Sequence, residues 1–202
     1  MDGAAASLPS SAPVAADAGV RLSTSAPVFY DCEATCIGGL PIEISWADPS
    51  ANEIASESHL IKPPSHWDMQ SVWDPDAAKL HGISRELLAA NGKPPFMIAR
   101  RMNEALAGRE LFSDAPGDDE HWLRTIFGEA DSDPSFTIRR THADVLIGNL
   151  AVARGWTLAA YEAVKDEVPR LAPRTHRAEA DARHLALLWQ MVSKGPNNYR
   201  CE

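Results

Sequence analysis

A short apolar run that leads directly into two acidic residues constrains the fold of this chain more than any other segment. Residues 26–30 predict a buried strand. Because side chains alternate between the two faces of a strand, Asp31 and Glu33 point the same way while Cys32 points to the opposite face. The pattern therefore predicts a sheet with two carboxylates side by side at the end of one strand.

Two neighbouring carboxylates need a partner or solvent. Like charges at this distance repel each other, and burial disfavours both ionised forms, so the pair is most stable around a divalent cation. Hard cations such as magnesium or manganese take oxygen ligands. The alternative is a strand that simply runs out into solvent, with Asp31 and Glu33 exposed at its mouth.

A histidine and an aspartate mark the start of the last predicted helix. From Arg177 onward, apolar positions recur at helical spacing. At about 100° per residue, His176 and Asp181 converge only if His176 lies in the loop before the helix, and a cap at Thr175 would place the start there. Such a pair suits a general base that reaches a water on a metal. The alternative is a solvated aspartate beside an ordinary surface histidine.

Taken in order, these motifs resemble a known family. Asp-x-Glu on a first strand, Asp-x-x-Trp-Leu from Asp119 and His-x-x-x-x-Asp from His176 resemble the DEDDh, or DnaQ-like, 3′-5′ exonucleases. Residues 40–47 and 79–88 add to the likeness, the second through a His-Gly-Ile turn before a helix. Each motif is short, but their order and spacing, from about residue 27 to residue 189, are more specific together.

The resemblance implies a fold, an activity and a site. The fold is α/β and ribonuclease H-like: a mixed sheet of three antiparallel strands and then parallel strands, flanked by helices. The activity is hydrolysis of phosphodiester bonds from a 3′ end, which releases nucleoside 5′-monophosphates with two Mg²⁺ or Mn²⁺ ions about 3.5–4 Å apart. The residues carried over are the metal ligands Asp31, Glu33, Asp119 and Asp181 and the general base His176.

The middle motif departs most from the family pattern. Its segment offers Asp114, Asp118 and Asp119, and a glycine and an aspartate replace the usual bulky partner before the ligand. Asp119 is the preferred ligand because Trp122 and Leu123 follow it at the family's spacing and would anchor a helix in the core. Asp114, at the end of a predicted strand, is the second choice, with capping of a helix or turn as its other role.

The remaining pattern alternates between strands and helices. Residues 41–47 and 53–61 predict two strands, joined at 48–52 by a turn-rich link that suits a hairpin. Trp67 and Trp73, in a loop at 62–75, can stack on bases, although tryptophans more often pin a loop to the core. The later predictions are helices at 84–90, capped by Ser84, and 94–107, a strand at 109–113, a helix at 119–127, a strand at 136–139, and helices at 141–154, 158–168 and from 177.

Length and composition predict one domain at residues 26–194. A chain of 202 residues, 45% hydrophobic and 23% charged, is ordinary for a globular protein. Residues 1–25 predict a disordered tail without the features of a secretory signal, and 195–202 a short C-terminal tail. No apolar run approaches membrane-spanning length, and three cysteines without metal-like spacing argue against a disulfide framework. The cytoplasm is the expected compartment.

The net charge of −9 limits the nucleic acid that the chain can bind. Proteins that bind long duplexes through many phosphates are basic, whereas an enzyme that holds a few terminal nucleotides needs less positive charge. The predicted partners are single-stranded DNA or RNA 3′ ends or short oligonucleotides, with a homodimer as the other partner considered. Five arginines near the later motifs either line the phosphate path or balance nearby carboxylates: Arg139, Arg140, Arg174, Arg177 and Arg183.

Two other functions are compatible with these residues. A degenerate member of the family would bind nucleic acid or a protein without cleaving it, because a fold does not fix a function. The five filled chemical positions favour an enzyme over such a module. A hydrolase of dinucleotides and very short oligonucleotides would use the same metal site. Among the other histidines, only His81 is singled out as a residue of interest.

Overall fold

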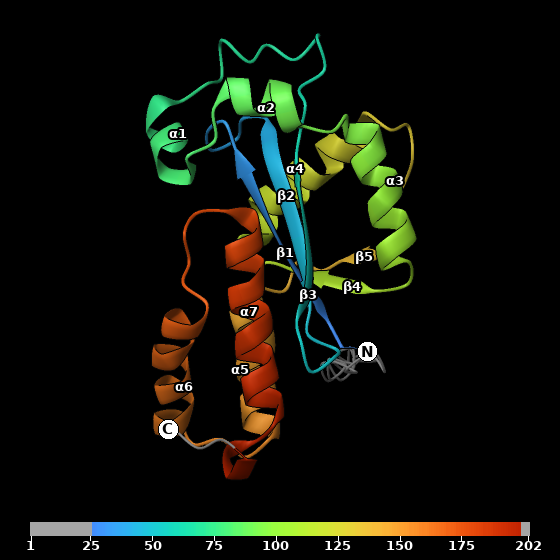
Figure 1. The fold of residues 1–202 in the computed structure, drawn as a ribbon. Coiled ribbons are helices and arrows are strands. Elements are labelled where there is room, and N and C mark those ends of the chain that lie inside the picture. Colours follow the sequence, from blue (N-terminus) through green and yellow to red (C-terminus); the bar gives the residue numbers. More distant parts are fainter. Residues whose placement is uncertain (1–25, 199–202) are drawn as a thin grey trace, which may run out of the picture.

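The computed structural model describes residues 26–198, so the predicted tail at 1–25 and residues 199–202 lie outside the described part (Figure 1). Within it, the strands are β1 (Val28–Ala34), β2 (Pro41–Asp48), β3 (Ala55–Leu60), β4 (Glu110–Phe112) and β5 (Thr137–Ile138). The helices are α1 (Pro75–His81), α2 (Arg85–Asn91), α3 (Pro95–Leu106), α4 (Pro116–Gly128), α5 (Ala143–Ala153), α6 (Leu158–Leu171) and α7 (Ala178–Ser193), followed by a 3-10 turn at Pro196–Asn198.

The five strands form one mixed sheet in the order β3-β2-β1-β4-β5. β1 and β2 pair antiparallel, as do β2 and β3, whereas β4 runs parallel to both β1 and β5. This confirms the predicted architecture of three antiparallel strands followed by parallel ones. In the β1–β2 register Asp31 lies opposite Ser45 and Glu33 opposite Glu43, so both acidic residues of β1 lie on one face of the sheet, as their spacing predicts.

Helices cover both faces of the sheet, with β1 in the middle (Figure 1). Phe29 packs with the residues of α5, α6 and α7, and its ring centroid lies 6.1 Å from that of Trp189. Its neighbours Val28 and Tyr30 point to the other face and pack with α3 and α4. Because Asp31 and Glu33 follow Phe29 in the alternation, they emerge on the face that α7 covers.

Three boundaries differ from the prediction by three residues or more. β1 does not end before the acidic pair but continues to Ala34, because its backbone stays paired with β2. α4 begins at Pro116, three residues before the predicted start, since proline fits the first turn of a helix. α6 continues to Leu171, beyond the predicted end at residue 168, with Pro169 in its last turn.

The sequence prediction omitted α1, although its caps are recognisable. The Oδ1 atom of Asp74 accepts the Asp76 N–H at 2.8 Å, and Gly82 ends the helix with a φ of 68°. The predicted cap of the next helix is confirmed, because the Ser84 hydroxyl oxygen accepts the Leu87 N–H at 3.2 Å. Together α1 and α2 cover the end of the sheet beyond the acidic pair (Figure 1).

The predicted cap of the last helix is wrong. α7 begins at Ala178 with Arg177 in the N-cap position, and Arg177 makes no side-chain cap, nor does Thr175 occupy that position. The acceptor comes instead from β2, because the Glu43 Oε2 atom accepts the Ala178 N–H at 3.0 Å. A carboxylate there also complements the positive end of the helix dipole.

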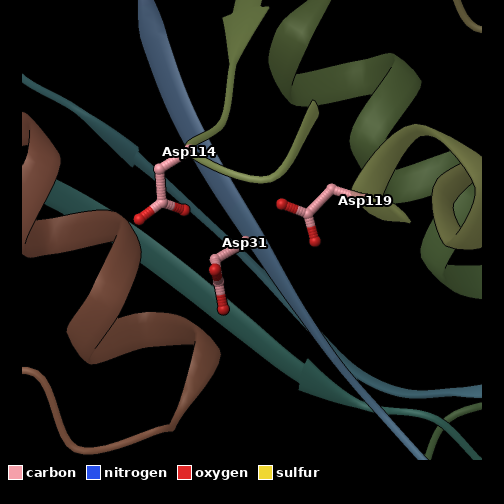
Figure 2. Close-up of side chains that lie close together, drawn as sticks. All are labelled: Asp31, Asp114 and Asp119. Atoms are coloured by element: carbon pink, nitrogen blue, oxygen red, sulfur yellow. The ribbon is translucent and has the colours of Figure 1, made fainter. Parts of the chain in front are cut away.

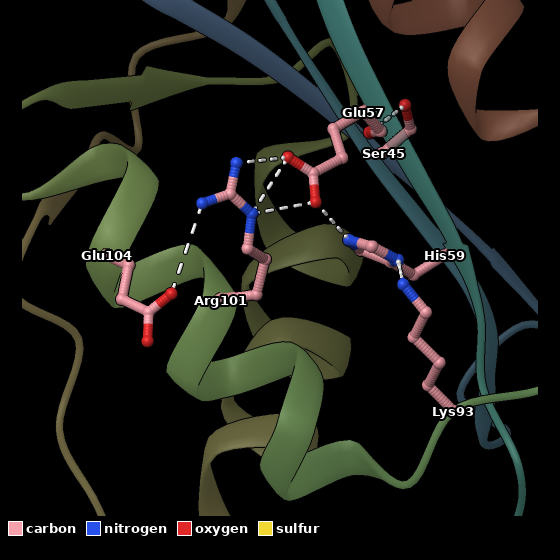
Figure 3. A network of polar contacts seen from close by, with 6 residues as sticks. All are labelled: Ser45, Glu57, His59, Lys93, Arg101 and Glu104. Carbon is pink, nitrogen blue, oxygen red and sulfur yellow. Dashed lines mark hydrogen bonds and ion pairs between the residues drawn. The ribbon is translucent and has the colours of Figure 1, made fainter.

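A polar network on the opposite face ties α3 to the edge strand β3 (Figure 3). The Arg101 guanidinium donates to both oxygens of Glu57 at 2.8–2.9 Å, and the His59 Nε2 atom lies 2.8 Å from the same carboxylate. The Lys93 ammonium lies 3.0 Å from Nδ1 of His59, which must accept this bond because lysine only donates. Burial and then Lys93 lower the pKa of His59, so the ring is neutral and fixed in one tautomer.

Both tryptophans of the long loop pack against the protein. Trp67 packs on the core beneath α3 and α4 and donates its Nε1–H to Glu129 at 2.9 Å. Trp73 packs on the small cluster under α1 and α2, and the Arg85 guanidinium lies 4.9 Å from its ring centroid. Neither half-buried ring therefore depends on a ligand for its position. Within residues 26–198, no helix combines the length and apolar character needed to cross a bilayer.

Candidate metal centre

Carboxylates from four separate segments converge beside β1. Two groups of three each have ligand oxygens within 4.8 Å of one another: Asp31 with Asp114 and Asp119, and Asp31 with Glu33 and Asp181. Figure 2 shows the first group, in which Asp119 projects from α4 and Asp114 from the segment after β4 toward Asp31. Because Asp31 belongs to both groups, the arrangement offers two adjacent sites with one shared ligand.

The shortness of β4 explains how Asp119 reaches β1. β4 pairs with β1 only at Val28 and Phe29, so the backbone of β1 beyond this point has a free edge on that side. Asp119 fills the gap: its Oδ1 atom accepts the Cys32 N–H at 3.1 Å, and its Oδ2 atom accepts the Ser113 hydroxyl. Asp119 is only 1% exposed, so these two hydrogen bonds, and not contacts with solvent, fix the position of its carboxylate.

The structure narrows the choice among the three aspartates of the middle motif. Asp119 and Asp114 both belong to the first acidic group, whereas Asp118 is exposed and belongs to neither group within residues 26–198. Asp114 is half-buried and forms an ion pair with Arg174. Trp122 and Leu123 lie in the core, as the sequence predicts, and Trp122 donates its Nε1–H to the Gly39 carbonyl at 3.0 Å.

Asp181 and His176 lie at the N-terminal end of α7. Asp181 is buried in the first turn and accepts the Thr175 N–H at 3.3 Å. His176 lies in the loop before the helix, as predicted, and is exposed, with a left-handed φ of 53° that is uncommon for a residue other than glycine. Burial raises the pKa of Asp181, while Arg174, the Thr175 amide and His176 oppose that rise.

The carboxylates of the centre cannot all be ionised near neutral pH without a cation. Burial, and then Asp119, Glu33 and Asp181, raise the pKa of Asp31 well above its ordinary value. Burial and then Asp181 raise the pKa of Glu33 to about 8, and burial raises that of Asp119 to about 7. Four clustered carboxylates, two of them buried, with this excess of negative charge fit a hard divalent cation such as Mg²⁺ or Mn²⁺.

These shifts predict how the stability of the metal-free protein depends on pH. Glu33 holds a proton up to about pH 8 in the folded state but only to about 4.5 when unfolded, so the folded state binds more protons between these values. The free energy of unfolding in EDTA should therefore fall, by on the order of 1–3 kcal/mol, as pH rises from 5.5 to 8. Urea unfolding at several pH values measures this change.

The same measurements with Mn²⁺ provide the comparison. Because an ion replaces the lost protons, the stabilisation by Mn²⁺ should be larger at pH 8 than at pH 6. A free energy of unfolding that stays constant over this range, with or without Mn²⁺, would show that the carboxylates do not repel each other as their positions imply.

Glu43 is a structural residue of the centre that the sequence did not reveal. It lies opposite Glu33 in the β1–β2 pair, and its side chain is only 2% exposed. The Arg177 guanidinium donates to both of its oxygens, at 3.0 and 2.6 Å, in addition to the amide at the start of α7. Glu43 therefore fixes the start of α7, and with it Asp181, against β2. The only local signal was a glutamate between two isoleucines of a buried strand.

Most of the five arginines near the later motifs pair with carboxylates of the chain. Arg174 and Arg177 lie at the acidic centre, whereas Arg183 donates to the Ile54 carbonyl and the Ser56 hydroxyl. The other two pairs are Arg139 with Glu110 and Arg140 with Glu120. Four of the five arginines thus balance nearby carboxylates, as the second of the two interpretations predicts.

His81, the other histidine of interest, is buried where α1 meets the next loop. Its Nδ1 atom accepts the Ile83 N–H at 3.0 Å, which fixes the turn before α2. Its Nε2 atom has no hydrogen-bond partner in the described part of the chain, and burial lowers its pKa. The lowered pKa favours the neutral ring, whose role in the structure is to fix the turn between α1 and α2.

Comparisons with known proteins show the fold. No protein-family model and no curated protein matches the sequence. Among solved structures, E. coli exonuclease I in complex with a dA16 oligonucleotide matches with a TM-score of 0.62 and 15% identity, over 86% of this chain and 42% of that one. The apo form of the same enzyme matches with a TM-score of 0.58 and 16% identity, over 87% of this chain and 43% of that one. Its zinc-bound complex with single-stranded DNA matches with a TM-score of 0.59 and 16% identity, over 84% of this chain and 40% of that one.

This likeness shows that the chain shares the fold of E. coli exonuclease I, the mixed sheet flanked by helices that the sequence predicts. The chain spans less than half the length of those structures. The acidic groups around Asp31 therefore lie on a fold that the chain shares with E. coli exonuclease I.

Proposed function

We propose that this protein is a metal-dependent 3′-5′ exonuclease of the DEDDh, or DnaQ-like, type. It hydrolyses phosphodiester bonds from the 3′ end of single-stranded or short nucleic acid and releases nucleoside 5′-monophosphates. The observation that carries the proposal is the convergence of carboxylates from β1, α4 and α7 into two groups that share Asp31. The solved complexes of E. coli exonuclease I with single-stranded oligonucleotides support it on the same fold.

Each residue of the centre has a role in the proposed reaction. Asp31, Glu33, Asp119 and Asp181 would hold two Mg²⁺ or Mn²⁺ ions, which lower the pKa of a water and neutralise charge on the phosphate. His176 takes the proton of the attacking water, for which its exposed place beside Asp181 is suitable. The water oxygen bonds to phosphorus, the bond from phosphorus to the 3′ oxygen breaks, and that oxygen is protonated. The terminal nucleoside 5′-monophosphate then leaves.

The test is release of mononucleotides from a 5′-labelled single strand of about twelve nucleotides. We expect a ladder that shortens from the 3′ end with Mg²⁺ or Mn²⁺, no reaction in EDTA, and none when the 3′ end carries a phosphate. DNA and RNA strands are compared in parallel. Binding of the strand without cleavage in Mn²⁺ would contradict the proposal and support a degenerate binding module.

A dinucleotide substrate distinguishes the proposed exonuclease from the second alternative, a hydrolase of very short oligonucleotides. The four-carboxylate centre could equally serve a hydrolase that acts only on very short oligonucleotides. Under the main proposal, kcat/KM for the twelve-nucleotide strand equals or exceeds that for a dinucleotide. A rate on the dinucleotide at least ten times higher than on the longer strand would favour the alternative.

Replacement of His176 by alanine tests the general base. We expect kcat to fall about 100- to 1,000-fold, the range for loss of a positioned base, while Mn²⁺ affinity stays within about twofold. Single-turnover cleavage and isothermal titration calorimetry measure the two quantities. His121→Ala, which removes an exposed histidine from α4, is the matched control. Equal activity of the His176 variant and the wild type would exclude this role.

A further inference from the structure

One guanidinium reaches into the acidic centre. Arg174 lies in the loop between α6 and α7, and its Nη1 atom donates to the Oδ2 atom of Asp114. Asp114 belongs to the group that also contains Asp31 and Asp119. Among residues 26–198, no other member of the two acidic groups forms an ion pair with a lysine or arginine. The nearby Arg177 pairs with Glu43, which belongs to neither group.

The positive charge of Arg174 acts on more than its direct partner. Burial lowers its pKa, but Asp114, then Asp181 and Asp31, more than offset this effect and raise it. These three carboxylates come from both acidic groups. In the metal-free protein, the guanidinium therefore neutralises part of the negative charge of the centre.

The same contact sets up a competition. The carboxylate of Asp114, which Arg174 contacts, also offers an oxygen to the group where Asp114, Asp31 and Asp119 approach one another (Figure 2). A divalent ion beside Asp31 and Asp119 would neutralise Asp114 in the place of Arg174, so the ion and the guanidinium compete for the same negative charge. The side chain of Arg174 is 40% exposed on a loop, so it can move away without unpacking the core.

We propose that Arg174 is an exchangeable counter-ion of the centre. It neutralises Asp114 while no metal is bound and releases Asp114 when a divalent ion takes its place. The released guanidinium then binds the phosphate of the terminal nucleotide, a group for which its planar donors are well suited. This inference rests on the proposed function, because it requires that the acidic groups bind metal.

Calorimetric titration of the metal-free protein with Mn²⁺, in the absence of nucleic acid, tests the first step. Arg174→Ala should bind Mn²⁺ about three- to tenfold more tightly than the wild type, because the competing charge is gone. Arg174→Lys, which keeps the charge, should stay closer to the wild type. Arg170→Ala removes an exposed arginine paired with Glu167 on α6 and should change nothing.

The second step predicts the opposite effect on a phosphate ligand. With Mn²⁺ held at saturation, Arg174→Ala should bind thymidine 5′-monophosphate about tenfold more weakly. A role limited to holding the loop would weaken the binding of both ligands or of neither. Tighter binding of the metal together with weaker binding of the nucleotide is therefore specific to the proposed exchange.

A double-mutant cycle with Asp114→Asn identifies the partner. Because asparagine carries no charge, most of the gain in Mn²⁺ affinity from Arg174→Ala should disappear in the Asp114→Asn background. The inference is wrong if Arg174→Ala binds Mn²⁺ no more tightly than the wild type, or if the full gain persists without Asp114. Arg174→Gln repeats the test if the alanine variant does not fold. A wild type that binds no Mn²⁺ would instead contradict the proposed function itself.

Discussion

Asp31→Asn is expected to lower kcat/KM for a single-stranded oligonucleotide at least about 1,000-fold, and at the same time to make the metal-free protein more stable. Asp31 contributes to both acidic groups, so its loss weakens both sites for metal. Its ionised form is also disfavoured by burial and by four other carboxylates, and the neutral amide removes that repulsion. Single-turnover kinetics in Mn²⁺ and urea unfolding in EDTA measure the two effects.

The opposite signs of these effects make the experiment decisive. A residue that merely supports the fold would lose activity and stability together. Asp144→Asn, at an exposed position in the first turn of α5, is the control and should leave both quantities near those of the wild type. Substantial activity of Asp31→Asn in Mn²⁺ would exclude the proposed centre, whatever its effect on stability.

The second large effect concerns the middle motif. Asp119→Asn is expected to lower kcat/KM about 100- to 1,000-fold, because the buried carboxylate would lose its charge while keeping its size. Asp114→Asn should cost about tenfold, since it changes the same group but also frees Arg174. Asp118→Asn should cost less than about twofold, because its side chain is exposed and belongs to neither group.

The ranking of these three variants assigns the ligand. If Asp114→Asn loses most of the activity and Asp119→Asn little, Asp114 binds the metal and Asp119 serves to cap the free edge of β1. Calorimetry with Mn²⁺ should give the same order as the kinetics. Circular dichroism of each variant shows whether the helices and the sheet survive the loss of a carboxylate that accepts hydrogen bonds from Cys32 and Ser113.

Local patterns predicted those parts of the site that depend on local geometry. The alternation of a strand places Asp31 and Glu33 on one face, and β2 holds them there. Helical geometry requires His176 to lie outside the last helix, and the loop conformation agrees. In both cases the relevant residues are at most five positions apart, so backbone geometry alone fixes their relation.

Contacts between segments that are far apart in the sequence could not be predicted from local patterns. Glu43 caps a helix that begins 135 positions later in the chain, and no spacing within β2 indicates that partner. Asp114 and Asp119 both reach Asp31 because the chain reverses tightly between β4 and α4, which the sequence could not distinguish from a longer loop. The start of α7 was placed at the wrong residue for the same reason, because its cap comes from another strand.

The three-residue connection between β4 and α4 makes the centre more sensitive to insertions there than to insertions elsewhere in the sheet. Within it, Ser113 accepts the Ala115 N–H at 2.9 Å and donates to Asp119, so the connection and the carboxylate share one hydroxyl. An inserted residue there would displace Asp119 from the edge of β1, whereas the turn between β2 and β3 touches none of the clustered carboxylates. We therefore expect the hairpin to tolerate changes in length that the connection between β4 and α4 does not.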